Sequence, residues 1–237
     1  MYSVLLLDCM VCCVLLLFDD GPVDDDPRSG YAREWATPLI SAPCQEPVWF
    51  CAGLVLPSCS AYLLRKEALG GNMSNYSCCQ GYFDCAPCFQ AGKFGEADNP
   101  ELCLLIEACF CTHFAVQATR FHMMDTRNIR PDPTDNRVIR LHNCLQCLSF
   151  IADMAACISK DAEMIDAAQA IRIVADCVYI TLLSCFAAQT KAELKAEQKG
   201  GTTNVAAAPI PIQMARGGPA QPVQAIPVAH PVTMNRM

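Results

Sequence analysis

Residues 161–199, DAEMIDAAQAIRIVADCVYITLLSCFAAQTKAELKAEQK, decide the fold class of this chain. Apolar residues recur in this stretch at spacings of three and four, which is the period of an amphipathic α-helix. Asp161 is a suitable N-cap, and Gly200-Gly201 follows the last expected turn. The pattern therefore predicts one long helix and a mainly α-helical fold. The residues of its apolar face are Met164, Ala168, Ile171, Ala175, Val178, Leu182 and Phe186.

Three earlier apolar segments also predict helices. They cover residues 48–64, which Pro57 interrupts, residues 102–119 and residues 138–159. Each segment is close to the length of a membrane span, but the last two carry charged residues in their interior. A charge at the bilayer centre costs about 2.5–3.5 kcal/mol. Isolated single spans are therefore disfavoured, and a bundle that buries these charges or lies in the membrane interface is favoured.

The composition excludes several classes of protein. Of 237 residues, 53% are hydrophobic, 17% are charged and 18 are cysteines, and the formal net charge is −7. Intrinsic disorder needs low hydrophobicity and high charge, so the chain as a whole is not of that class. It is also too long to depend on disulfides for a core. The negative charge argues against nucleic acid as a partner.

Composition divides the chain into three parts. Residues 1–37 contain an apolar run, which fits a short anchor, and an acidic stretch that we expect to be a disordered linker outside the folded domain. The run lacks the basic start and the cleavage site of a signal peptide, so we expect reduced, cytoplasmic thiols. Residues 42–200 are predicted to form a Cys-rich helical domain with an irregular Cys-rich loop. The Pro-rich residues 201–237 are predicted to be a disordered tail.

One group of cysteines has the density of a metal site. Cys78, Cys79, Cys85 and Cys88 supply thiols within a turn-rich segment, which is the setting of a zinc-binding loop. The alternative is that reduced cysteines pack as small hydrophobic residues. A thiol oxidoreductase is disfavoured, because the segment from Cys85 to Cys88 lacks the preceding strand that such an active site follows.

Four charged residues lie within the predicted apolar helices. Glu107, Asp153, Arg172 and Asp176 are candidates for an ion path or for a metal-coordinating carboxylate set. The alternative is one or two buried ion pairs, or an exposed face.

A further charged segment, residues 120–140, alternates arginines with aspartates. This pattern predicts a solvated mixed-charge loop, with an anionic-lipid site as the alternative. The chain has no phosphate-binding glycine motif, no nucleophile elbow and no H-E-x-x-H zinc helix. We therefore predict no enzymatic activity.

A series of short segments carries a family resemblance. The segments are CAGLVLPSCSAYLLRKEAL (51–69), MSNYSCCQGY (73–82), PELCLLIE (100–107), ATRFHMMD (118–125), DN (135–136) and ADCVY (175–179). In this order they resemble plant and protist members of the placenta-specific-eight cysteine-rich family. The resemblance covers about residues 42–200.

The resemblance implies a Cys-rich, membrane-associated protein without enzymatic activity. Other branches of that family are linked to cell-number control, heavy-metal resistance and ion transport. Relatives tend to carry C-D-N-C where this chain has residues 134–137, and a cysteine where it has Asn99. Metal binding through those positions is therefore not expected here.

Three hypotheses follow from the sequence. The first is a non-enzymatic membrane-associated protein with lipid as a partner and with homo-oligomers or other proteins as further candidates. The alternative is a soluble zinc-binding interaction module built on the four clustered cysteines. The third is a metal-transport subunit that uses Glu107 and Asp176.

Overall fold

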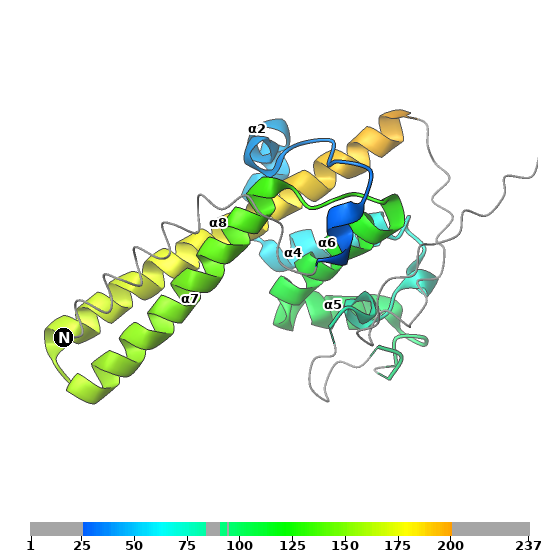
Figure 1. Ribbon diagram of the computed structural model, residues 1–237. Helices are drawn as coiled ribbons and strands as arrows, with labels where there is room; N and C mark the ends of the chain where they lie inside the picture. The colour runs from blue at the N-terminus through cyan, green and yellow to red at the C-terminus, as the bar shows by residue number, and fades with distance from the viewer. Residues whose placement is uncertain (1–25, 84–90, 94, 201–237) are drawn as a thin grey trace, which may run out of the picture.

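The computed structural model describes residues 26–83, 91–93 and 95–200 (Figure 1). In these residues the only β-type pairing is one bridge between Arg33 and Ile129, so the predicted mainly α-helical fold is confirmed. Short 3-10 turns come in two pairs, η1 and η2 before α2, and η3 and η4 between α4 and α5. In chain order the elements are η1 (Pro27–Gly30), η2 (Leu39–Ser41), α2 (Ala42–Gln45), α3 (Pro47–Val55), α4 (Pro57–Ala68), η3 (Met73–Asn75), η4 (Cys78–Gly81), α5 (Pro100–Phe110), α6 (Thr112–Arg127), α7 (Pro133–Ser159) and α8 (Ala162–Gly200).

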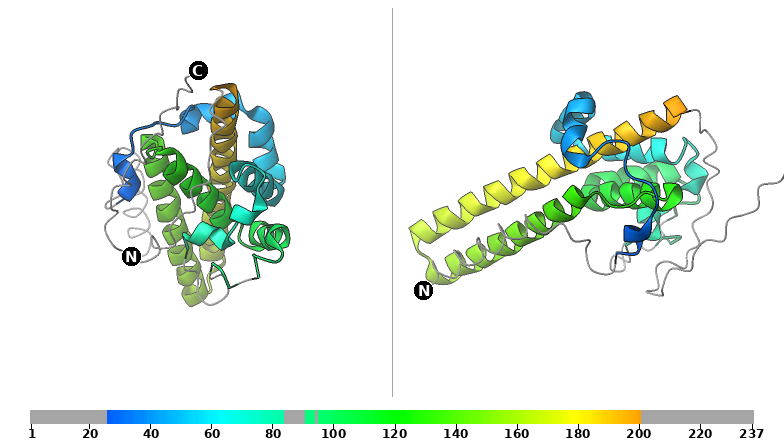
Figure 2. Two further views of the ribbon diagram at one scale, coloured as in Figure 1. Left: turned by 90° about the vertical axis from the view of Figure 1, so that its right-hand side faces the viewer. Right: turned by 45° about the horizontal axis from the view of Figure 1, so that its top comes forward.

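The molecule has two regions. Most of α7 and the N-terminal half of α8 project side by side as an antiparallel pair (Figures 1 and 2). We call residues 144–180 the hairpin. The other described residues surround the C-terminal half of α8, and we call them the body. Both regions share α8, which runs from the tip of the hairpin to the far end of the body (Figure 2).

Proline starts several of the helices. Pro47, Pro57, Pro100 and Pro133 each occupy a first-turn position, where the missing N–H has no intrahelical partner to lose. Pro57 therefore divides residues 48–64 into α3 and α4, as expected.

The expected helix over residues 102–119 is not continuous. The chain breaks at Cys111, whose φ of −130° and ψ of 42° are not helical, and α6 leaves α5 at an angle of 118°. No proline or glycine marks this break.

The expected solvated loop over residues 120–140 is wrong. Helices α6 and α7 include most of it, and Arg120 and Asp135 are buried and paired. The guanidinium of Arg120 also bonds to Gln189 and lies 4.6 Å from the Trp35 ring and 4.2 Å from the Phe186 ring. These partners replace water, which is how a charge is tolerated in the core.

The folded part begins before residue 42. Trp35 and Leu39 are only 7% and 2% exposed, and the fully buried carboxylate of Glu193 in α8 accepts hydrogen bonds from the Arg33 side chain and the Ala36 N–H. Residues 26–37, which were assigned to the linker, thus pack on the body. The apolar run at residues 3–18 and the tail at residues 201–237 lie outside the described residues.

The prediction for α8 is confirmed. Its expected apolar face is the inner one, since Ala168, Ala175, Leu182 and Phe186 are all buried. In the body, α8 also approaches α3 closely. A Cβ added at Gly53 would lie 2.7 Å from the Cα of Ser184, so only glycine fits at this crossing.

Candidate functional site

The two helices that form the hairpin and continue into the body, α7 and α8, have the length and composition of membrane-crossing helices. Helices α7 and α8 contain 18-residue windows with mean hydropathy of 1.3 and 1.8, and no more than two charged residues in each window. A third span would require α5 and α6 to act together, but this pair is sharply bent. We therefore treat only α7 and α8 as candidate spans.

The two helices of the hairpin meet through small side chains. Ala152 and Ala156 on α7 and Ala168 on α8 form a buried cluster, against which Met164 and Ile171 pack. Small residues allow two helix backbones to approach closely, which is a common arrangement between helices in lipid.

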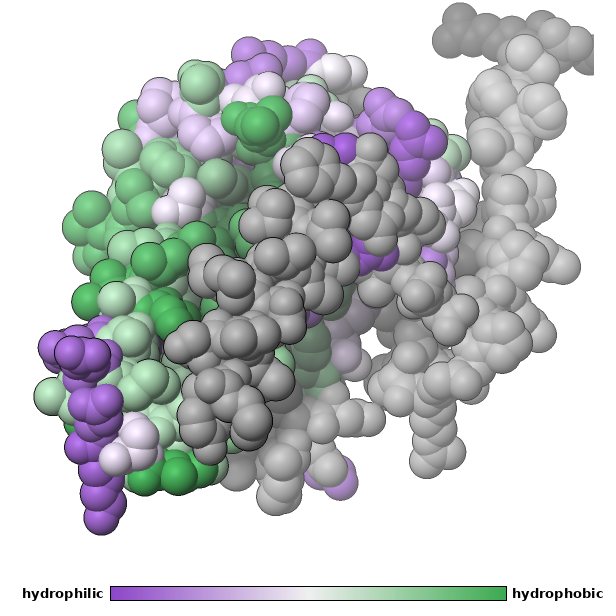
Figure 3. All heavy atoms as spheres, turned by 60° about the vertical axis from the view of Figure 1, so that its left-hand side comes forward, coloured by the Kyte–Doolittle hydropathy of each residue, from purple (hydrophilic) through white to green (hydrophobic). Residues whose placement is uncertain are grey.

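Large apolar side chains face outward instead. Hydrophobic surface covers much of the face seen in Figure 3, the side from which the hairpin projects. The exposed large apolar residues of the hairpin are Phe150 (67% exposed), Met154, Ile158, Ile165, Ile173, Val174 and Ile180. Helices in water normally bury their large apolar residues. The hairpin has the opposite distribution, and contiguous apolar surface of this kind marks a membrane or protein contact.

Away from its tip, the hairpin carries four charged residues, which are Asp153, Arg172 and the exposed Asp166 and Asp176. Arg172 on α8 and Asp153 on α7 form an ion pair with a 2.5 Å separation between Nη2 and Oδ2. The fourth candidate for an ion path, Glu107, belongs to the body. The structure thus joins two of the four candidates as a pair and does not bring all four together.

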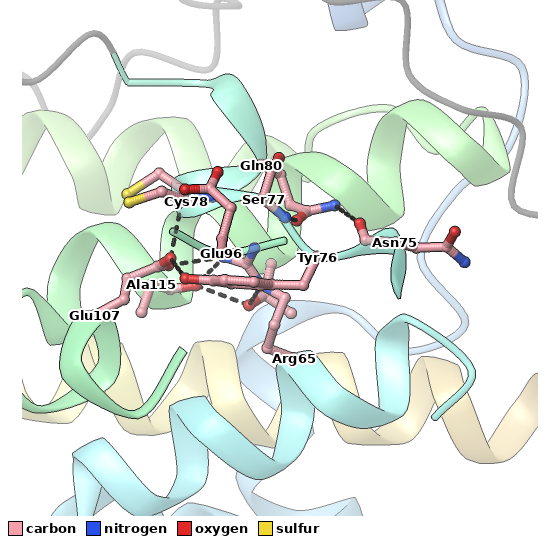
Figure 4. A network of polar contacts seen from close by, with 11 residues as sticks. Arg65, Asn75, Tyr76, Ser77, Cys78, Gln80, Glu96, Glu107 and Ala115 are labelled. Atoms are coloured by element: carbon pink, nitrogen blue, oxygen red, sulfur yellow. Dashed lines mark hydrogen bonds and ion pairs between the residues drawn. The ribbon is translucent and has the colours of Figure 1, made fainter. Parts of the chain in front are cut away.

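Glu107 on α5 is the centre of a buried polar network in the body (Figure 4). Its Oε1 pairs with Nη2 of Arg65 on α4 at 3.3 Å, and both side chains are at most 1% exposed. Its Oε2 accepts hydrogen bonds from the Tyr76 hydroxyl and the Cys79 N–H, both at 2.8 Å. Arg65 also donates to Thr119 and to the carbonyl of Ala115. The network ties α4, α5 and α6 to the loop before η4.

Two of the four clustered cysteines lie beside this network. Cys78 and Cys79 are each 2% exposed. Their sulfur atoms and a carboxylate oxygen of Glu107 all lie within 4.8 Å of one another. Cys85 and Cys88, the other two members of the sequence-based zinc set, lie outside the described residues.

The backbone at these cysteines is strained. Cys79 and Gln80 have φ of 47° and 49°, and Gly81 has φ of 71°. Non-glycine residues in the left-handed region cost of order 1–2 kcal/mol each. The turn is held by hydrogen bonds that satisfy its backbone, including those from the Cys78 N–H to Glu96 at 3.0 Å and from the Ser77 N–H to Gln80 at 2.8 Å.

The surroundings of the Cys79 and Cys103 thiols raise their pKa values. The hydrogen bond with Cys78, burial and the nearby Glu107 carboxylate raise the pKa of the Cys79 thiol. Burial, followed by the charge of Glu96, raises the pKa of the neighbouring Cys103 thiol. A raised pKa makes the Cys79 and Cys103 thiols poor nucleophiles at neutral pH.

Sequence reasoning missed the partners of Glu107. Arg65 lies in a segment that reads as the charged end of a helix, and Tyr76 and Thr119 have no distinguishing pattern. The available signals were that Arg65 directly follows the apolar run SAYLL and that all three partners fall in segments of the family resemblance.

A scan against protein-family models and searches of curated proteins and of solved structures found no match to this chain.

Proposed function

We propose that this protein is a non-enzymatic membrane protein whose hairpin inserts into the lipid bilayer and holds the body at the membrane surface. The observation that carries the proposal is the distribution of side chains on the hairpin, with a buried alanine cluster between the helices and seven large apolar residues exposed on the outside. In water this arrangement would expose the apolar residues at a cost of about 25 cal/mol for each Å². In lipid it is the favourable one.

The dimensions of the hairpin support insertion. Residues 162–180 of α8 extend for about 28 Å at 1.5 Å per residue, close to the ~30 Å of a hydrocarbon core. Lys160, Asp161 and Glu163 lie at the tip and would reach the far interface. The ion pair of Asp153 with Arg172 would neutralise two charges at depth, which lowers the cost of burying them in lipid.

The family resemblance agrees with this proposal. The segments at residues 51–69 and 175–179 resemble those of Cys-rich, membrane-associated proteins, and the chain carries no catalytic motif among those considered. A role in metal or ion homeostasis or in growth control is supported by that resemblance alone.

The proposal is tested by alkaline carbonate washing of membranes from cells that express the full chain. We expect the wild-type protein to stay in the membrane pellet. The double substitution Phe150→Lys with Ile173→Lys places two charges on the outer face of the hairpin, each costing about 2.5–3.5 kcal/mol near the bilayer centre. We expect it to move the protein to the soluble or degraded fraction.

Two controls make the result specific. Ile40→Lys introduces the same charge at a residue of the body that is 76% exposed, and it should leave the protein in the pellet. Deletion of residues 1–25 removes the terminal apolar run and should also leave it there. Release of the wild-type protein by carbonate would refute insertion. Loss of retention on the deletion, with no effect of the two lysines, would assign the anchor to the terminal run instead.

A further inference from the structure

We infer that Cys78, Cys79 and Glu107 bind one thiophilic divalent cation, of the class of Zn²⁺ and Cd²⁺. The inference is independent of membrane insertion. It also differs from the zinc set suggested by the sequence, because a carboxylate from a distant helix replaces Cys85 and Cys88. The ligand atoms of the three buried side chains, two from η4 and one from α5, lie within 4.8 Å of one another; Figure 4 labels Cys78 and Glu107.

The ligand atoms are nearly at coordination distance. Two thiolates bound to one tetrahedral zinc at 2.3 Å stand about 3.8 Å apart. The sulfur and oxygen atoms here lie within 4.8 Å of one another, so small side-chain rotations bring them around a single cation. The fourth position of a tetrahedral cation is left for a water molecule or an additional thiol.

Glu107 has the capacity to act as a ligand. Its Oε2 already accepts two hydrogen bonds, but among the described residues its Oε1 has only the long 3.3 Å contact with Arg65. A carboxylate oxygen carries two lone pairs, so Oε1 retains one for a cation. The hydrogen bonds from Tyr76 and Cys79 fix the orientation of the carboxylate, as outer partners do for metal ligands.

The charge balance also favours a divalent cation. In their thiol form Cys78 and Cys79 carry no charge, and the charges of Glu107 and Arg65 cancel. When the cation binds, the two thiols lose their protons to solvent and become thiolates. The cation brings two positive charges, and the two released protons remove two. The buried cluster therefore stays neutral, and the large cost of burying a net charge does not arise. Thiolates select zinc-like and softer cations over Mg²⁺ or Ca²⁺.

The strained turn has a function in this arrangement. Adjacent residues of an extended strand point to opposite sides. The left-handed conformation of Cys79 and Gln80 instead turns both neighbouring thiols toward Glu107. Strain of this kind persists where the surrounding structure over-determines it, and it is concentrated at functional sites.

The test uses the full chain, purified in detergent with a phosphine reductant and stripped of metal by a chelator. Cd²⁺ is titrated while its thiolate charge-transfer absorption is followed, and Zn²⁺ is then used as a competitor. We expect one tight site per chain. Cys78→Ser and Cys79→Ser should each weaken that site by more than about 100-fold, because changes even outside the ligand set cost 10–100-fold.

Two control variants separate the alternatives. Cys185→Ser removes a half-buried thiol on α8 and should leave the tight site unchanged. The double variant Cys85→Ser with Cys88→Ser should also retain it, whereas the sequence-based zinc set requires that it be lost. Loss in this variant overturns the three-ligand assignment.

A measurement on the wild-type chain covers the case in which the Cys78 and Cys79 variants fail to fold. Alkylation by iodoacetamide is mapped by mass spectrometry with and without Zn²⁺, at a denaturant concentration where local opening exposes the buried thiols. Bound cation should protect Cys78 and Cys79 but not the exposed Cys147. Equal alkylation of Cys78 and Cys79 in both samples, or the absence of a tight site, overturns the inference.

Discussion

The body and the hairpin use charged and apolar residues in opposite ways. In the body, Arg65, Glu107 and Glu193 are among the least exposed side chains of the described residues. In the hairpin, Phe150 and Ile158 are the most exposed of the large apolar side chains, at 67% and 69%. Buried charges require fixed partners, so they define the relative positions of many helices at once. An outward apolar face requires only a hydrocarbon environment. The comparison therefore indicates that the body is held by specific polar contacts and the hairpin by small-residue packing and its surroundings.

The largest effect should come from breaking the buried ion pair of the body. Glu107→Gln leaves the buried guanidinium of Arg65 without its countercharge, and we expect the free energy of unfolding to fall by about 3–5 kcal/mol. Tyr76→Phe removes one hydrogen bond to the same carboxylate and should cost about 1 kcal/mol. Chemical denaturation in detergent measures both. A loss below about 1 kcal/mol for Glu107→Gln would mean that the polar network does not hold the body together.

A second effect concerns His122, a body residue that is 5% exposed and whose Nδ1 has no hydrogen-bond partner in the described residues. Burial, followed by the charges of Arg65 and Arg127, lowers the pKa of the imidazole to about 4. Between pH 6.5 and pH 4 the unfolded chain therefore binds a proton that the folded chain does not. Stability from this residue is complete above pH 6.5 and falls as the pH drops to 4, by up to about 3 kcal/mol.

The check on His122 is the free energy of unfolding as a function of pH. Carboxylates also titrate in this range, so the wild-type curve is compared with that of His122→Asn. The difference between the two curves should slope between pH 6.5 and pH 4 and be flat above pH 7. Parallel curves over the whole range would show that His122 titrates normally in the folded chain.

The smallest effect should come from the inner face of the hairpin. Ala152→Leu adds volume where α7 and α8 meet, and we expect it to destabilise the hairpin by about 1–3 kcal/mol. Phe150→Leu on the outer face should change stability by no more than about 0.5 kcal/mol. Hydrogen exchange of the α7 amides in detergent reports both changes. A larger effect of the outer substitution would reverse the assignment of the two faces.

Local sequence patterns predicted much of the hairpin and little of the body's interior. The apolar period of residues 161–199 is strong, and Asp161 and Pro57 mark boundaries by local chemistry that needs no partner. The break at Cys111 has no such marker. It depends on how α5 and α6 pack, which no short window of sequence contains.

The polar contacts of the body could not be predicted for the same reason. Arg65 and Glu107 are separated by 42 residues, and neither carries a signal that names the other. Residues 120–140 alternate in charge and therefore suggest a solvated loop, but Arg120 finds aromatic faces at Trp35 and Phe186, far away in the sequence. For the candidate metal site, the sequence indicated Cys78 and Cys79, but only the fold brings Glu107 beside them.

Because α8 is unbroken, a movement of the hairpin is transmitted rigidly to the part of α8 that lies in the body. The helix has 39 residues, which is about 58 Å, and no proline or internal glycine provides a hinge before Gly200. Spans accommodate a change in bilayer thickness partly by tilting. A tilt of about 10° at the hairpin would swing the far end of α8 by about 10 Å. Lys195, which lies there and pairs with Glu46, would move with it. If the hairpin lies in a bilayer, as proposed, membrane thickness would thereby set the orientation of the body relative to the membrane surface.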